Sequence, residues 1–500
     1  MATRQELRLH PWGYENDPEE ERFPLSTLDY LSVCAYDNMA LFFPLSEAAK
    51  PRVAAVLKEG LERTLSQCRH LVGTIEKNPD NTSHSFVKHR NSTVGFTIQH
   101  LPPPFPSFAD LEASHFLSSR LGPTKSLSFK GLTYADKPPT SADSHPIAAA
   151  FQANFIPGGL ILNTHHHHYA NDAMGWSGFV HQLADNCRAI MTNTPFPPWD
   201  PSSLDNTRFT SPQVPSHLQT SAPPPQPRNP ALRPCSYLLF HLPKSKAAAL
   251  KRLATPTEPD SDATFISTWD AFSAFLWRIL TKHRAALYYP PQNLNPSNRD
   301  APPTPWSEAV NMRPRISPPP PARTQGNIFI AASTSTTPLP GFQVQPTTST
   351  LLTSPLPTLA RTIRSVTCTA TQSRLATLLQ TVAPIRDKSA IALGLNSASA
   401  PLSLFTTDWR ETAICEADFG FGRPRAFRHL FDVVTEGLVI VYPPRREPES
   451  SSDDGEDDAG CEFVISVEKE IIPRLVEDDE MKQFFEYRGV EVEGGALRYR

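Results

Sequence analysis

Four consecutive histidines, His165–His168, lie in the middle of the chain, and Asp172 follows the last of them by four residues. The apolar runs "AAAFQANFI" and "GLILNT" precede them and are split by "PGG", which predicts two strands joined by a turn. An apolar stripe at helical spacing begins at Ala173. The histidines therefore lie between a strand end and a helix start. Free histidine titrates near pH 6.5, so an imidazole at the mouth of a cleft there is suited to general-base chemistry.

A metal site is the main alternative for this run. His168 and Asp172 would supply two ligands, but no third and fourth ligand follow at a recognisable spacing. Adjacent histidines also cannot all face one ion. We therefore expect no metal here, and expect Asp172 to cap or bridge the helix start more readily than to meet the imidazole.

The surrounding chain alternates helical and strand patterns, which predicts an α/β protein. Residues 51–68 carry an amphipathic helical stripe, and Ser267 and Asp270 resemble the capping box of a second helix, which Ile266 could staple. The runs "CSYLLFHLP", "GNIFIAAS", "GLVIVYP" and "EFVISVEKE" predict strands, and the acidic run between the last two predicts a solvated hairpin loop. Proline-rich residues 196–234 predict a crossover linker between an N-terminal domain, 1–195, and a C-terminal domain, 235–500.

Composition restricts the class of protein. The chain has 500 residues, 39% of them hydrophobic and 20% charged, with a net charge of −4 that offers no basic field for nucleic acid. Its seven cysteines are scattered and form no CxxC pair, which fits reduced thiols. No apolar run suits a signal peptide or a membrane span. We therefore expect a soluble cytoplasmic protein.

Several motifs together resemble one enzyme family. "HHxxxD" (His167, His168, Asp172) is followed late in the chain by "DFGFG" (Asp418 to Gly422), with "AVNMRPR" at 309–315 between them. This order is similar to that of the BAHD acyl-CoA-dependent acyltransferases, whose signatures are HHxxxDG and DFGWG. The C-terminal run "VISVEKEIIPRLVEDDEMKQF" is most similar to the fungal branch of the family. Ala173 and Phe421 depart from the usual glycine and tryptophan.

The resemblance implies a two-domain fold like that of chloramphenicol acetyltransferase, with a mixed sheet flanked by helices in each domain and a channel between the domains. It implies that His168 is the base, that His167 has a structural role, and that Asp172 pairs with Arg313. It also implies that the loop containing Asp418, Gly420 and Gly422 is structural. Thr407 and Trp409 occupy positions where related enzymes place donors to the oxyanion.

The resemblance further implies direct transfer of an acyl group, with acetyl expected, from acyl-CoA to a hydroxyl of a small hydrophobic fungal secondary metabolite. We expect a monomer that has no permanently bound cofactor. Three alternatives remain open: an N-acyltransferase, a condensation-domain-like enzyme acting on an amine, and an inactive binding homologue. A condensation domain would lack "DFGFG" and an inactive homologue would usually lose the histidine, but both features are present. Transfer from free acyl-CoA separates these possibilities.

Overall fold

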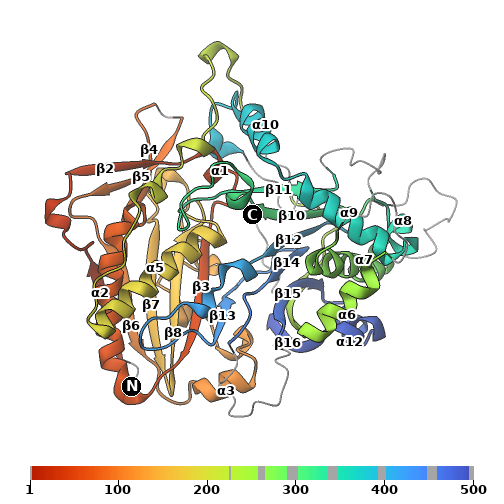
Figure 1. Ribbon diagram of the computed structural model, residues 1–500, viewed down its shortest axis with the longest axis horizontal. Helices are drawn as coiled ribbons and strands as arrows, with labels where there is room; N and C mark the ends of the chain where they lie inside the picture. Colours follow the sequence, from red (N-terminus) through yellow and green to blue (C-terminus); the bar gives the residue numbers. More distant parts are fainter. Residues whose placement is uncertain are drawn as a thin grey trace.

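The computed structural model describes residues 3–80, 82–224, 227–256, 265–289, 302–335, 346–391, 401–446 and 459–494. Two groups of strands lie side by side, each with helices packed against it (Figure 1). This arrangement confirms the expected α/β class with two mixed sheets. The buried apolar residues form a large cluster around each sheet.

The first sheet has six strands and is built mainly from the N-terminal half of the chain. Its β6–β7 pair is parallel and its other pairs are antiparallel. Helices α2 (Lys50–Gln67) and α5 (Ala173–Thr192) pack on one face, where their apolar stripes join the buried cluster. In spatial order the strands are β1 (Thr3–Leu9), β6 (Val94–His100), β7 (Ala149–Ile156), β8 (Gly159–His167), β3 (Tyr36–Pro44) and β13 (Ala426–His429).

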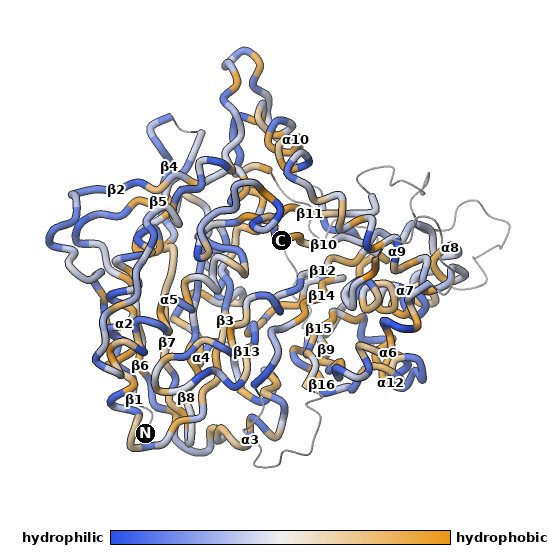
Figure 2. The backbone as a smooth tube through the Cα atoms, viewed as in Figure 1, coloured by the Kyte–Doolittle hydropathy of each residue, from blue (hydrophilic) through white to orange (hydrophobic). Residues whose placement is uncertain are grey.

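The second sheet has seven strands, and β12 is parallel to both of its neighbours. Helices α6 (Lys244–Ala254), α7 (Thr268–Tyr288), α8 (Thr348–Thr353) and α9 (Leu356–Cys368) contribute to its buried cluster. Every residue of β9 and β15 is buried, and the backbone in this region is coloured mainly as hydrophobic in Figure 2. The strand order is β11 (Phe329–Ser333), β10 (Trp306–Asn311), β12 (Leu404–Asp408), β14 (Leu438–Val441), β15 (Cys461–Glu468), β9 (Cys235–Leu242) and β16 (Glu486–Val492).

The remaining elements are short. A three-stranded sheet lies at one edge of the N-terminal half, in the order β2 (Glu20–Pro24), β5 (His84–His89) and β4 (Thr74–Lys77). The other helices are α1 (Thr27–Tyr30), α3 (Phe108–Ala113), α4 (Thr124–Leu127), α10 (Gln372–Val382), α11 (Ile472–Val476) and α12 (Asp479–Phe484).

Local sequence signals explain the helix boundaries. α7 begins with a complete capping box, in which Ser267 accepts from the Asp270 backbone and Asp270 accepts from the Ser267 backbone, as expected from the sequence. Ile266 is buried in the cluster that this helix joins. α5 begins at Ala173 with Asp172 as its N-cap, because the Asp172 carboxylate accepts from the backbone of Gly175 at 2.8 Å.

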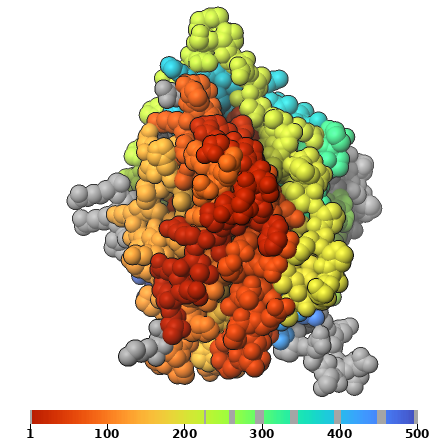
Figure 3. Space-filling view, turned by 90° about the vertical axis from the view of Figure 1, so that its left-hand side faces the viewer, coloured from red at the N-terminus to blue at the C-terminus, as the bar shows by residue number. Residues whose placement is uncertain are grey.

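The crossover forms no strand in its described residues, 196–224 and 227–234, and contains three short 3-10 turns. It runs along one edge of the face that the N-terminal residues form (Figure 3). Strand β13 comes from the C-terminal half of the chain but belongs to the first sheet, where it pairs with β3, Phe427 opposite Leu41. The domain boundaries 1–195 and 235–500 therefore stay a prediction from the sequence.

Most of the expected acidic loop, residues 447–458, lies outside the described residues. The strands on either side of it, β14 and β15, are antiparallel.

Candidate active site

A cavity of about 220 Å³ is lined by residues from both sheets, where the sequence resemblance places a channel. Strand β3 and the turn between β8 and α5 contribute from the first sheet, and β10, β11, β12 and β14 contribute from the second. Most of the surface that lines the cavity is apolar. Its polar side chains include Asp37, Tyr134, His168, Asp172, Thr407, Asp408, Trp409 and His429.

His168 lies one residue beyond the end of β8 and lines the cavity. Its backbone is fixed on both sides: its N–H donates to the Ala35 carbonyl at 2.8 Å, and its carbonyl accepts from Asn327 Nδ2 at 2.9 Å. The side chain is half-buried, and no protein group in the described part of the chain forms a hydrogen bond with its Nδ1. The imidazole is thus held in position through its backbone.

The other three histidines are buried in β8. Burial lowers the pKa of His165 to about 3 and the pKa values of His166 and His167 to about 4, so all three rings are neutral near pH 7. His167 lies with Nδ1 3.2 Å from the Tyr169 backbone N–H and Nε2 3.2 Å from the Thr140 carbonyl, which places its proton on Nε2. Of the four histidines, His168 alone lines the cavity.

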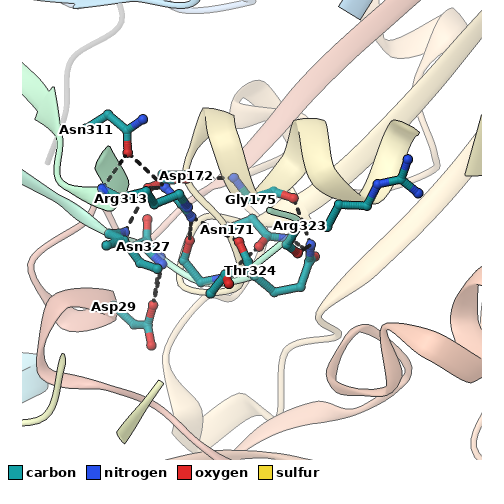
Figure 4. A network of polar contacts seen from close by, with 12 residues as sticks. Asp29, Asn171, Asp172, Gly175, Asn311, Arg313, Arg323, Thr324 and Asn327 are labelled. Carbon is teal, nitrogen blue, oxygen red and sulfur yellow. Dashed lines mark hydrogen bonds and ion pairs between the residues drawn. The ribbon is translucent and has the colours of Figure 1, made fainter. Parts of the chain in front are cut away.

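Asp172 is held by three donors (Figure 4). Arg313 Nη1 donates to its Oδ2 at 2.9 Å, and the Ile328 backbone N–H donates to the same oxygen at 2.8 Å, while Gly175 occupies Oδ1. Arg313 also donates to the carbonyls of Thr324 and Gly326. The expected contact between Asp172 and Arg313 is present, and it joins the start of α5 to the segment after β10.

Thr407 and Trp409 both line the cavity at the end of β12. Trp409 Nε1 donates to Thr407 Oγ1 at 2.9 Å. The indole proton is therefore used within the protein, whereas the hydroxyl proton of Thr407 stays available to an acceptor in the cavity. This differs from the expectation that both residues donate into the site, because the second donor is committed to orienting the first.

The "DFGFG" loop does not line the cavity and packs against α5. Asp418 Oδ1 accepts from the Gly420 backbone at 2.9 Å. Gly420 has φ of +77°, and a Cβ there would lie 2.8 Å from the Cα of Arg188, so glycine is needed for both conformation and space. Gly422 also has a positive φ, +150°. Phe421 is half-buried rather than fully in the core, with its ring 5.4 Å from Phe43.

Sequence reasoning missed four polar residues around the histidine. Asn327 holds the His168 carbonyl and also donates to Asp29, whose pKa burial raises to about 6. Asp37 on β3 and His429 on β13 line the cavity itself. Asp29 belongs to the capping box that begins α1, a local signal of helix structure. Asn327, Asp37 and His429 belong to no such motif, and their proximity arises from strand pairing and contacts between the two halves.

Within the described ranges, no three His, Cys, Asp or Glu side chains are grouped so that they could hold a metal ion. None of the helices described is both long and apolar enough to cross a membrane.

Known proteins share both sequence and fold with this chain. A family model described as the Transferase family matches residues 15–481. Acetyltransferase FGR3 of Gibberella zeae is 48% identical over 498 residues, covering 98% of this chain and 95% of the relative. Trichothecene 3-O-acetyltransferase TRI101 of Fusarium sporotrichioides is 25% identical over 487 residues, covering 91% and 94%.

The fold is shared with a solved structure. Fusarium graminearum TRI101, complexed with coenzyme A and T-2 mycotoxin, superimposes with a TM-score of 0.73 at 22% identity, covering 94% of this chain and all of that chain. At this identity the likeness shows the two-domain architecture. The chain therefore belongs to the Transferase family, in agreement with the BAHD motifs in its sequence, and is an acyl-CoA-dependent acyltransferase.

Proposed function

We propose that the enzyme transfers an acetyl group from acetyl-CoA to a hydroxyl of a small apolar fungal metabolite, with His168 as the general base. The position of His168 carries the proposal: it is the one histidine of the run that lines the cavity, and its ring is not tied down by a protein hydrogen bond at Nδ1 among the described residues. An apolar lining with a few placed polar groups suits such an acceptor.

The proposed reaction proceeds without an acyl-enzyme. The acceptor hydroxyl attacks the thioester carbonyl while His168 removes its proton, because an alcohol is too weak an acid to ionise first. The Thr407 hydroxyl donates a hydrogen bond to the oxyanion of the tetrahedral intermediate, and the Trp409 indole N–H orients that hydroxyl by donating to Oγ1. The intermediate then collapses, the C–S bond breaks, and His168 returns the proton to the coenzyme A thiolate.

The remaining site residues have structural roles in this proposal. Asp172 and Arg313 hold the start of α5 against the segment after β10, so they fix the His168 turn rather than relay its proton. His167 supports the turn through Tyr169 and Thr140. Gly420 packs against Arg188 and Met191 of α5, Asp418 fixes the same loop by accepting from the Gly420 backbone, and Gly422 supplies the positive φ that ends the turn.

The acceptor class is proposed from the relatives and the cavity. TRI101 is a trichothecene 3-O-acetyltransferase by name, and it is similar to this chain over 91% of its length. A cavity whose lining surface is mainly apolar favours a compact, sparingly polar molecule with a hydroxyl near His168. A monomer located in the cytoplasm stays the expectation from sequence.

A panel assay tests this proposal. Purified enzyme is incubated with acetyl-CoA and hydroxylated fungal metabolites, including trichothecene alcohols, and free thiol and acetylated product are measured together. Stoichiometric thiol release with an O-acetyl product supports the proposal. Transfer only to amine analogues would support N-acylation instead, and thiol release without any acetylated product would contradict acyl transfer to an acceptor.

A further inference from the structure

A carboxylate, Asp37, lies in the same cavity as His168 and belongs to none of the motifs in the sequence. On the first sheet Asp37 is paired with His166, two residues before His168. Side chains alternate along a strand, so Asp37 and Met39 share a face, and both line the cavity. The Asp37 side chain is 14% exposed, so little solvent screens its charge.

His429 provides the carboxylate with a partner from the other half of the chain. It lies on β13, which pairs with β3, and its Nε2 is 3.5 Å from Asp37 Oδ1. Its ring is stacked on Phe431, with centroids 3.8 Å apart and planes inclined by 22°. The imidazole is therefore held beside Asp37 by strand pairing and stacking together.

Asp37 is ionised near neutral pH. Burial alone would raise the pKa of its carboxyl, but the imidazoles of His168 and His429 hold that pKa below its ordinary value. His168 acts on this pKa through its charge, and His429 acts through both a hydrogen bond and its charge. The cavity that His168 lines therefore contains a negative charge, which favours a positive charge on its ring.

We infer that Asp37, held in place by His429, is a positioning residue that stabilises the imidazolium of His168. The inference rests on the proposed role of His168 as the base. When the acceptor proton moves to His168, the C–O bond forms and the ring becomes cationic beside the Asp37 carboxylate. When the C–S bond breaks, the proton passes to the thiolate. Asp37 takes no proton at either step, so its role is electrostatic.

Other charged groups near the base are already engaged. Asp172 is paired with Arg313 at 2.9 Å, and Asp408 with Arg410 at 2.6 Å. His166, whose pKa burial lowers to about 4, is neutral in the working range. His167 on the same strand is neutral as well. Tyr134 also lines the cavity.

The test is the pH dependence of Asp37→Asn, which removes the charge and keeps the shape. We expect kcat at pH 8 to fall by about 10- to 100-fold, because the charge lies in a partly desolvated site. We expect the KM for acetyl-CoA to stay within about threefold. The acidic limb of the kcat/KM profile should move to lower pH by about one unit, since loss of the carboxylate makes protonation of the imidazole less favourable.

Two further variants make the result specific. Asp270→Asn also removes a buried carboxylate, one paired with Arg364 at 2.9 Å in the α7 capping box, and should lower the melting temperature without moving the acidic limb. Asp37→Glu keeps the charge and should restore the wild-type limb. If Asp37→Asn does not fold, the profile is measured on Asp37→Thr, which is similar in size, neutral and suited to a strand.

An Asp37 variant with unchanged kcat and an unmoved acidic limb overturns the inference. A folded variant whose kcat falls while the acidic limb of its kcat/KM profile does not move also overturns the inference, because that result indicates a purely structural role. Retained turnover in His168→Ala would instead overturn the base itself. The failure of this inference alone is therefore recognised by an inactive His168→Ala enzyme together with an unperturbed Asp37→Asn enzyme.

Discussion

Asp172 Oδ2 lies 2.9 Å from Arg313 Nη1, and among the described residues no hydrogen bond joins Asp172 to His168. The carboxylate that follows the histidine run by four residues therefore anchors one half of the chain to the other. Both side chains are only 10% exposed, so the ion pair is largely desolvated.

We expect Asp172→Asn to lower both stability and activity, since it leaves Arg313 buried without its counter-charge. Breaking such a pair costs about 3 kcal/mol of unfolding free energy. Denaturant unfolding and kcat are the two measurements. Asp185→Asn, on the same helix and paired with the partly exposed Arg323, is the control and should cost under about 1 kcal/mol. An Asp172→Asn enzyme of unchanged stability but without activity would indicate a direct catalytic role.

The buried histidines should make the protein less stable in acid. In the folded state the pKa of His166 lies at about 4, below its unfolded value of about 6.5, so the unfolded state binds more protons between these values. Stability is therefore complete above pH 6.5 and falls toward pH 4, by up to about 1.4 kcal/mol per pH unit for this residue.

Replacing His166 with phenylalanine should remove that share of the pH dependence while leaving turnover per folded molecule near wild type. Unfolding free energies at pH 7, 6 and 5 provide the comparison. His145→Ala serves as the control, because the His145 side chain is 64% exposed and should not change the slope. A His166→Phe protein with the wild-type slope would show that another group dominates the acid response.

Thr407→Val tests the proposed oxyanion donor. Valine has the shape of threonine without the hydroxyl, so folding should be little affected and kcat should fall by about 10²- to 10³-fold. Trp409→Phe removes the donor that orients Thr407 and should reduce kcat by a smaller factor. Steady-state kinetics with saturating acetyl-CoA distinguish the two. Wild-type kcat in Thr407→Val would exclude the hydroxyl from oxyanion stabilisation.

Much of this architecture could be predicted from local patterns. The capping box at Ser267, the helix at 51–68 and the strands before His168 follow from spacing that acts within a few residues. The pairing of β13 with the first sheet could not be predicted. A strand of four residues is too short to show an alternating pattern, and its partner β3 lies far away in the sequence.

Only those site residues that belong to sequence motifs could be predicted. His168 and Asp172 belong to a motif, and the resemblance led to Arg313. Asp37 and His429 lie in ordinary strand sequence, and only the packing of β13 beside β3 brings them to the cavity. The hydrogen bond from the Trp409 indole to Thr407 likewise depends on side-chain geometry, which the spacing of residues in the sequence does not specify.

Metal removal and kinetic pattern test whether the histidine run is an imidazole site or a zinc site. We expect full activity after treatment with EDTA, and inhibition by added zinc, because a ligated imidazole cannot accept a proton. Initial rates should intersect as a sequential pattern in acetyl-CoA and acceptor. Parallel lines would instead indicate an acyl-enzyme, and activity lost in EDTA and restored by zinc would indicate a metal enzyme.

The most direct test of the account is the turnover of His168→Ala beside His165→Ala and His166→Ala at equal folded concentration. We expect kcat to fall by about 10²- to 10⁴-fold in His168→Ala alone, with little change in melting temperature because this side chain is only half-buried. The two buried-histidine variants should be less stable, by about 2 kcal/mol or more, yet active when folded. Near-wild-type turnover in His168→Ala would contradict the assignment of the base.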